Sequence, residues 1–359
     1  MTEIQKFYQQ KTVFITGGTG FIGKTMIEKL LRCTDIGRLY LLIREKRGVD
    51  HRQRLQQLFN SRLFDRLRSE KTGWESRVRA VQGDIERPLL GLSGQDQDTL
   101  INEVRLQPLL LPHPHPHLTS PQTEIVFHCA ATVRFDEDLS KALTMNVSAV
   151  SFIISLCKKM SRLESLVHVS TAYCHCQRPH IEERSYPPPT QPRQALSLLE
   201  SLDTKILDNP AFTKMLIGER PNTYTFTKAL AEELIMSEAR ELPVCIVRPS
   251  IVLSTWRDPV PGWVDNLNGP TGLFLIAGIG VMRTAVIHED LQTDGVPVDT
   301  CANLTLAAAW RTALEHRSVR MRSIVYSVYV SVLMHIADDL RIIVRIRKED
   351  DRQKRPGCN

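Results

Sequence analysis

The chain has 359 residues, of which 42% are hydrophobic, and a formal net charge of +6 at pH 7. This length and composition can form a large buried core, and so modest a charge gives no case for nucleic-acid binding. The cysteines are scattered, with Cys174 and Cys176 as the only close pair, so we expect reduced thiols and no metal site. The first eleven residues are polar and contain no apolar secretory segment.

A strand and a glycine-rich turn open the predicted fold. The apolar run 12–15 is followed by Thr16-Gly17-Gly18-Thr19-Gly20-Phe21-Ile22-Gly23, and a helix is predicted from residue 21 to about residue 32. Glycines at this spacing let the backbone turn tightly, approach a pyrophosphate and pack the helix on the sheet. The first glycine gap is one residue longer than usual, and a turn without a ligand is the alternative. We predict these cofactor-binding residues: Thr16, Gly17, Gly20, Phe21, Ile22 and Gly23.

The second predicted strand, 39–43, ends at Arg44, which lies 21 residues after Gly23. Enzymes that bind NAD place a carboxylate there, whereas an arginine suits the 2′-phosphate of NADPH. Lys46 and Arg47 add positive charge, and Glu45 removes a little. We therefore predict NADPH as the cofactor, with a basic loop facing water as the alternative.

Four further strand-like runs follow, at 78–82, 125–129, 166–169 and 244–248. They are short and mostly apolar, and helical patterns separate them, which is typical of a buried parallel sheet in a doubly wound α/β fold. Ligands of such sheets bind beyond the carboxyl ends of the strands. We assign the residues at those ends to the cofactor site: Asp84, Ile85, Ala130 and Pro249.

Two pairs of polar residues suit carbonyl reduction. Ser170 and Thr171 end the fifth run and can donate a hydrogen bond to a carbonyl oxygen. Tyr224 and Lys228 are four residues apart, on one face of a predicted helix, where the ammonium is expected to lower the pKa of the phenol. A helix N-cap and a solvated helix face are the alternatives. The presence of both pairs beside a nucleotide motif favours catalysis.

Several stretches of the chain resemble alcohol-forming fatty acyl-CoA reductases of the insect type, which are extended short-chain dehydrogenase/reductases. The resemblance runs from about residue 3 to about residue 317. Its most selective blocks are Val133-Arg134-Phe135-Asp136-Glu137 and Pro261-Gly262-Trp263. The stretches that carry it are 14–24, 126–137, 168–173, 224–229, 247–252, 261–266 and 269–272.

The resemblance implies a Rossmann-type reductase domain at 11–317, with substrate-binding or lid parts at about 177–223 and 254–300. It implies NADPH-dependent reduction of a long-chain fatty acyl-CoA to a fatty alcohol through a bound aldehyde, in lipid, wax or ether-lipid precursor metabolism. The implied catalytic residues are Tyr224, Lys228, Thr171 and Ser170. Two alternatives stay open, namely another extended reductase acting on a sterol or sugar-nucleotide, and a truncated, non-catalytic NADPH-binding form.

Two regions depart from the family pattern. Residues 105–123 are rich in proline and histidine, and we expect an unpacked loop there rather than a metal site; a gene-model error is the alternative. After residue 317 the family continues into a helical C-terminal domain, whereas we expect 318–359 to be a divergent tail that lacks it. The apolar run 323–334 is shorter than the ~20 residues that span a bilayer.

The resemblance also implies a cellular setting. It places the chain on the cytosolic side, at a peroxisomal or endoplasmic reticulum membrane, with peripheral association and no transmembrane span. The positive net charge suits anionic lipids or the phosphates of CoA. The sequence predicts neither the oligomeric state nor the preferred acyl chain length.

Overall fold

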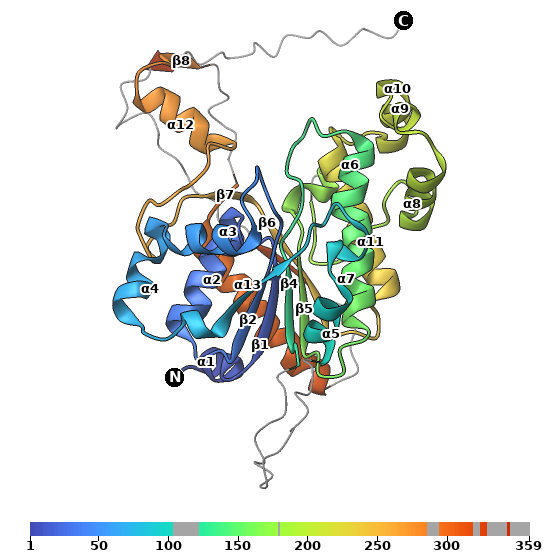
Figure 1. The fold of residues 1–359 in the computed structure, drawn as a ribbon. Helices are drawn as coiled ribbons and strands as arrows, with labels where there is room; N and C mark the ends of the chain where they lie inside the picture. Colours follow the sequence, from blue (N-terminus) through green and yellow to red (C-terminus); the bar gives the residue numbers. More distant parts are fainter. Residues whose placement is uncertain (103–121, 179, 286–293, 319–323, 329–342, 345–359) are drawn as a thin grey trace, which may run out of the picture.

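The computed structural model describes residues 1–102, 122–178, 180–285, 294–318, 324–328 and 343–344 (Figure 1). Its centre is a seven-stranded sheet in the order β10-β6-β5-β4-β1-β2-β3, and every neighbouring pair in it is parallel. The predicted doubly wound α/β fold is confirmed. The strands of this sheet are β1 (Thr12–Thr16), β2 (Arg38–Ile43), β3 (Val78–Gln82), β4 (Ile125–His128), β5 (Ser165–Val169), β6 (Val244–Pro249) and β10 (Ile324–Val328).

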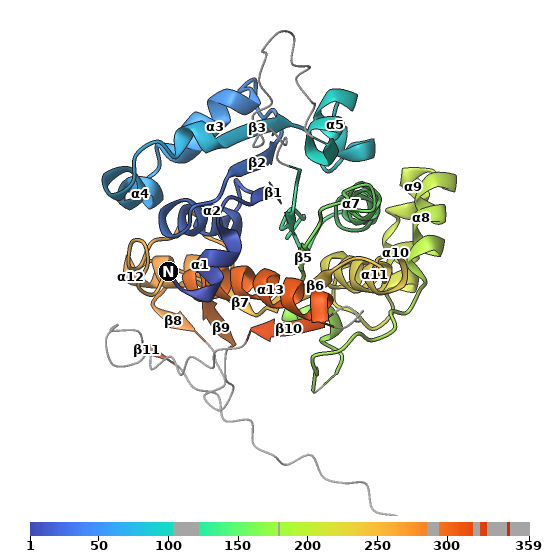
Figure 2. The same ribbon diagram turned by 90° about the horizontal axis from the view of Figure 1, so that it is seen from below.

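Helices cover both faces of the sheet (Figures 1 and 2). One face carries α1 (Glu3–Tyr8), α2 (Phe21–Cys33), α3 (His51–Phe59), η1 (Arg62–Phe64), α4 (Asp65–Glu70) and α13 (Val298–Ser318). The other face carries α5 (Gly94–Asn102), α6 (Leu139–Leu143), the π-helical turn η4 (Thr144–Ser148), α7 (Ala149–Cys157) and α11 (Thr223–Glu238).

The remaining elements are short. Two 3₁₀ turns flank β3, at η2 (Glu75–Arg77) and η3 (Pro88–Gly91), and η5 (Ala172–His175) follows β5. The predicted substrate parts contain α8 (Pro192–Ser201), α9 (Thr204–Leu207), α10 (Pro210–Ile217) and α12 (Pro270–Gly278). Two small parallel pairs complete the fold: β7 (Ile251–Leu253) with β9 (Gly295–Pro297), and β8 (Thr284–Ala285) with β11 (Ile343–Val344).

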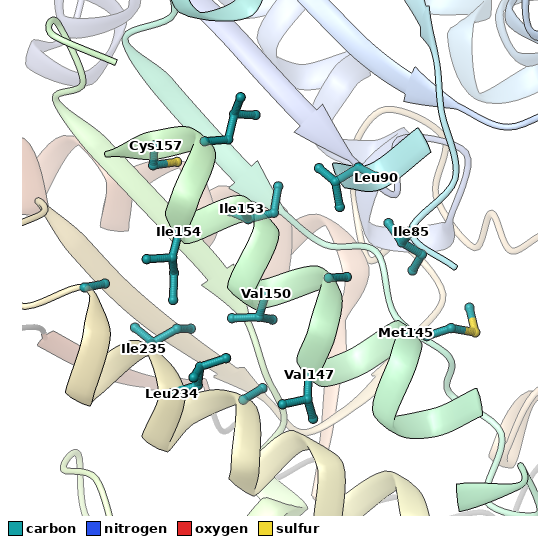
Figure 3. Packing of buried hydrophobic residues seen from close by; sticks show 14 of the residues in the cluster. Ile85, Leu90, Met145, Val147, Val150, Ile153, Ile154, Cys157, Leu234 and Ile235 are labelled. Carbon is teal, nitrogen blue, oxygen red and sulfur yellow. The ribbon is translucent and has the colours of Figure 1, made fainter. Parts of the chain in front are cut away.

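Successive side chains of each central strand enter opposite cores, because side chains alternate across a strand. In β1, Val13 and Ile15 join the core under α2 and α13, whereas Phe14 joins the core under α7 and α11. Figure 3 shows part of the second core, where Ile153 and Leu234 pack beneath the sheet. Both faces are apolar, so most of the strands are continuous hydrophobic runs in the sequence, and six of the seven strands of this sheet could be predicted.

The seventh strand, β10, lies in the region that we expected to be a divergent tail, and its backbone pairs with β6. The proline- and histidine-rich insertion at 105–123 lies almost wholly outside the described residues. Of the residues that the structure describes, one helical run, Leu139–Cys157, is long and apolar enough to cross a bilayer. It is weak evidence for a span, because 61% of it is buried in the protein.

Candidate active site

The glycine-rich turn between β1 and α2 forms a close-packed backbone cradle. Gly17 has a φ of +74°, and a Cβ there would lie 2.6 Å from the backbone nitrogen of Ala130. A Cβ on Gly23 would lie 2.2 Å from the Gly17 carbonyl oxygen. Gly20 is the N-cap of α2 and has no side chain to cap it, so backbone N–H groups at this end can meet a phosphate. The turn fits the diphosphate of a dinucleotide cofactor.

The Thr16 side chain helps to hold this turn in place. Its Oγ1 lies 2.8 Å from Nδ1 of His128 and accepts a hydrogen bond from the Ala130 N–H at 3.3 Å. The side chain therefore joins the ends of β1 and β4. Ile22 packs against the core beneath α2, and Pro249 is buried at the end of β6.

A loop from the predicted lid region lies against the first turns of α2. The rings of Phe21 and Trp263 are stacked with centroids 5.4 Å apart, and Lys24 forms an ion pair with Asp265. The carboxylate of Asp258 anchors the start of this loop to α2 and α4. It accepts hydrogen bonds at 2.6–2.7 Å from three cations: Lys29, Arg32 and Arg66. The Pro-Gly-Trp block therefore lies beside the cofactor turn.

Arg44 follows β2 as predicted, but two carboxylates pair with its guanidinium. Its Nη1 lies 2.9 Å from Oε1 of Glu86 and 3.7 Å from Oδ2 of Asp84. Ile85, between these two carboxylates in sequence, is buried in the core shown in Figure 3. Arg54 of α3 donates a hydrogen bond to the Arg44 carbonyl, so a second guanidinium lies at this position. Burial and the charge of Arg44 lower the pKa of Arg54.

The structure brings the predicted catalytic side chains together at the carboxyl end of β5. Asn222 caps α11, which places Tyr224 in the first turn and Lys228 one turn later. The buried Nζ of Lys228 donates a hydrogen bond to the Val169 carbonyl at 2.8 Å. The Thr171 hydroxyl acts to lower the pKa of the Tyr224 phenol, so the two side chains lie close together. A carbonyl oxygen placed between them would meet two hydroxyl donors.

The expected effect of Lys228 on the phenol is wrong for this arrangement. Burial raises the pKa of Tyr224 to about 12, and the neighbouring Thr171 hydroxyl offsets only part of that rise. Burial also lowers the pKa of Lys228 to about 8. Loss of water from around the phenolate outweighs any attraction to the ammonium. Tyr224 is therefore protonated at neutral pH, which is the form that a proton donor requires.

Asn146 is a site residue that the sequence reasoning missed. It lies in the π-helical turn η4, and such turns are frequent at functional sites. Its Oδ1 accepts a hydrogen bond from the Thr132 N–H at 2.9 Å, and its Nδ2 donates one to Oγ1 of Thr227 at 3.0 Å. These bonds join the Val-Arg-Phe-Asp-Glu segment to α11. The ring of Phe135 lies 5.7 Å from the ring of Tyr224.

A second group of side chains that the sequence reasoning did not identify is buried next to the catalytic residues. Cys174, His175 and Glu232 hold three atoms of metal-ligand type within 4.8 Å of one another. Both carboxylate oxygens of Glu232 already accept hydrogen bonds from the Arg248 guanidinium, at 2.6 and 2.9 Å. A fixed positive charge at that distance opposes a bound cation. Ser170 is buried directly before Thr171, and it contributes to lowering the pKa of Glu232 to about 2, after the larger effects of Arg248 and His175.

A protein-family model described as Male sterility protein matches residues 15–106 and 111–305. Fatty acyl-CoA reductase 1 of Xenopus laevis is 45% identical over 311 residues, and its human counterpart is 43% identical over 311 residues. Fatty acyl-CoA reductase wat of Drosophila melanogaster is 43% identical over 310 residues. Each alignment covers 86% of this chain and 56% of the relative, so the chain spans little more than half the length of these relatives.

Solved structures agree on the fold. The terminal R domain of the myxalamid PKS-NRPS pathway has a TM-score of 0.59 at 23% identity, and it covers 90% of this chain and 67% of that one. The reductase domain of a nonribosomal peptide synthetase from Mycobacterium tuberculosis has the same score and coverage at 21% identity. At such identities the likeness shows the fold alone. The family match confirms the resemblance predicted from the sequence. The close-packed glycine turn agrees with it, because such a turn suits a nicotinamide dinucleotide. The chain therefore belongs to the male sterility protein family of NAD-binding domains, as a relative of the fatty acyl-CoA reductases.

Proposed function

We propose that the chain reduces a long-chain fatty acyl-CoA to the primary alcohol, using NADPH and keeping the aldehyde bound between two reductions. The observation that carries this proposal is the placement of Thr171 and Tyr224 close together, beside Lys228 at the carboxyl end of β5. This pair lies at the strand edge that also holds the cofactor turn, two strands away in the sheet. The names of the curated relatives supply the substrate class.

The two reductions use the same side chains. Bound NADPH supplies one hydride to the carbonyl carbon in each step, so that one thioester, two NADPH and two protons give one primary alcohol and free CoA. Thr171 donates a hydrogen bond to the carbonyl oxygen while the carbon–sulfur bond of the thioester breaks. Tyr224 then gives its proton to the alkoxide oxygen formed from the aldehyde. Lys228 adds a nearby positive charge that favours both oxyanions.

The choice of NADPH rests on the arginines after β2. Arg44 and Arg54 lie together, and a 2′-phosphate would accept hydrogen bonds from two forks of donors. Glu86 is the internal competitor, because it already pairs with Arg44. A dianionic phosphate offers more charge than one carboxylate, so exchange of partners is favourable.

The same proposal assigns 177–223 and 254–300 to the acyl-CoA side of the site. The loop that carries Trp263 and the helix α12 belong to this side, and apolar side chains of α12 are exposed: Leu273, Leu275 and Ile276. By family resemblance we place the chain on the cytosolic side of a peroxisomal or endoplasmic reticulum membrane, in peripheral association with it.

The test is incubation of the purified chain with palmitoyl- or stearoyl-CoA and NADPH, followed by chromatography of the lipid products. We expect hexadecanol or octadecanol and two NADPH consumed per alcohol. The Tyr224→Phe variant serves as the matched control. Cofactor binding without any alcohol or aldehyde would refute the enzymatic proposal and leave a non-catalytic NADPH-binding form.

A further inference from the structure

The catalytic helix and the first segment of the substrate side meet at one buried ion pair. Glu232 and Arg248 are among the most buried side chains, with exposed fractions of 1% and 0%. Arg248 comes from β6, and its Nε and Nη2 donate to the two carboxylate oxygens of Glu232 at 2.9 and 2.6 Å. Two parallel hydrogen bonds of this kind fix both the distance and the angle between the groups.

Glu232 lies on the catalytic side of α11. Tyr224, Lys228 and Glu232 follow one another at intervals of four residues, so they line one side of the helix. The Glu232 carboxylate also holds the turn η5, which begins directly after Thr171. Cys174 of that turn donates to its Oε1 at 3.3 Å. One carboxylate thus joins the helix that carries Tyr224 to the turn that Thr171 caps.

Arg248 extends the connection to the substrate side. Its Nη1 donates to the Glu182 carbonyl at 3.1 Å, and its Nη2 donates to the Arg184 carbonyl at 2.9 Å. This segment folds around the buried ring of Tyr186, whose hydroxyl accepts the Glu182 N–H at 2.9 Å. The guanidinium of Arg184 lies 4.5 Å from the centre of that ring. The segment is therefore ordered from two sides, by the arginine and by the aromatic ring.

We propose that the Glu232–Arg248 pair is a positioning element of the reductase site, which sets the distance between Thr171 and Tyr224 and fixes the 182–184 segment. Neither residue touches the reacting atoms. A buried pair costs desolvation that an apolar pair of similar size would avoid, so stability alone is a weak reason to have it here. Three further hydrogen bonds connect the pair to the turn η5 and to the 182–184 segment, which an apolar pair cannot do. The inference rests on the proposed function for its kinetic test.

The first test is the double variant Glu232→Met/Arg248→Met, which removes both charges of the ion pair together, so that neither of the two is left buried alone. The control is Arg193→Met/Glu238→Met, which removes an exposed ion pair between α8 and the end of the same helix α11. We expect both variants to fold and to bind NADPH like the wild type. We expect kcat with palmitoyl-CoA to fall about ten- to a hundredfold in the buried variant alone, the loss typical of catalytic groups displaced by about 1 Å.

A second measurement does not depend on the substrate. Arg184 is exposed, and its carbonyl is held by Arg248, so release of that carbonyl should speed tryptic cleavage after Arg184. We expect faster cleavage in the buried double variant and unchanged cleavage in the control. If the wild type makes no alcohol but this difference is seen, the proposed function fails while the physical link survives. Equal cleavage in wild type and buried variant overturns the link.

The kcat of the buried double variant also tests the proposal. A folded buried variant with wild-type kcat overturns the positioning role. If that variant does not fold, Glu232→Asp replaces it, because aspartate keeps the charge beside Arg248 but shortens the side chain by one methylene. We expect Glu232→Asp to fold and to lose part of kcat with little change in KM. Wild-type kcat in Glu232→Asp overturns the proposal.

Discussion

The pairing of Arg44 with Glu86 makes cofactor choice measurable with three variants. A hydrogen bond between a guanidinium and a phosphate contributes about 1.5–3 kcal/mol. The side chains of Arg44 and Glu86 are 40% and 34% exposed, so their ion pair contributes only about 0–1 kcal/mol, which the phosphate must displace. The net contribution of Arg44 to NADPH binding is then about 0.5–3 kcal/mol, or roughly two- to a hundredfold in affinity.

We therefore expect Arg44→Ala to weaken NADPH binding within that range and to leave NADH binding unchanged. Glu86→Gln should strengthen NADPH binding by up to about fivefold, because it removes the competing charge. Arg52→Ala is the control, since it removes an exposed cation from the first turn of α3, the helix that carries Arg54. Fluorescence titration of both cofactors into each variant decides the question. Equal losses for NADH and NADPH in Arg44→Ala would mean that this arginine is structural, and the reasoning would fail.

Three further predictions concern the turn and the catalytic pair. Tyr224→Phe should retain NADPH binding and lose about 10²- to 10⁴-fold in kcat, measured by alcohol formation; wild-type turnover would remove the phenol from the mechanism. Gly23→Ala should abolish cofactor binding in titrations and lower the melting temperature, because its Cβ would lie 2.2 Å from the Gly17 carbonyl oxygen. Gly94→Ala is the control and should change neither property, because no atom lies within 4 Å of its Cβ. Wild-type cofactor binding in Gly23→Ala would contradict the role of the glycine turn. Burial lowers the pKa of Lys228 to about 8, so kcat should fall as the pH rises through about 8 and the ammonium loses its proton. The residual activity of Lys228→Arg should not fall in that range, because arginine stays protonated. If the pH profile of Lys228→Arg matched that of the wild type, the titrating group would be another residue.

The sequence was sufficient for most of the fold because its strands are buried on both faces. The runs that became β1, β2 and β4 are short, apolar and bounded by turn residues, and their parallel order follows from the helices between them. β10 could not be recognised in the same way. Its residues lie in a longer apolar run, 323–334, that carries no turn signal within it, and only the pairing with β6 defines the strand.

The candidate site was predictable where local spacing encodes it and not where distant residues meet. The four-residue interval of Tyr224 and Lys228 predicted one helix face, and the structure has it. The direction of the Tyr224 pKa shift was wrong, because burial by surrounding elements cannot be read from two residues of one helix. Glu86 lies 42 residues beyond Arg44, so its competition for the guanidinium appears only in three dimensions.

The two edges of the central sheet are protected in different ways. At one edge, β3 presents exposed Arg79 and Gln82, and charged or polar residues on an edge strand discourage another chain from pairing with it. At the other edge, every residue of β6 is buried, and β10 takes up the backbone hydrogen bonds of that strand. β6 without β10 would be an unprotected apolar template for intermolecular strand addition. The backbone of β10 therefore covers an edge of the sheet that would otherwise be open to another chain.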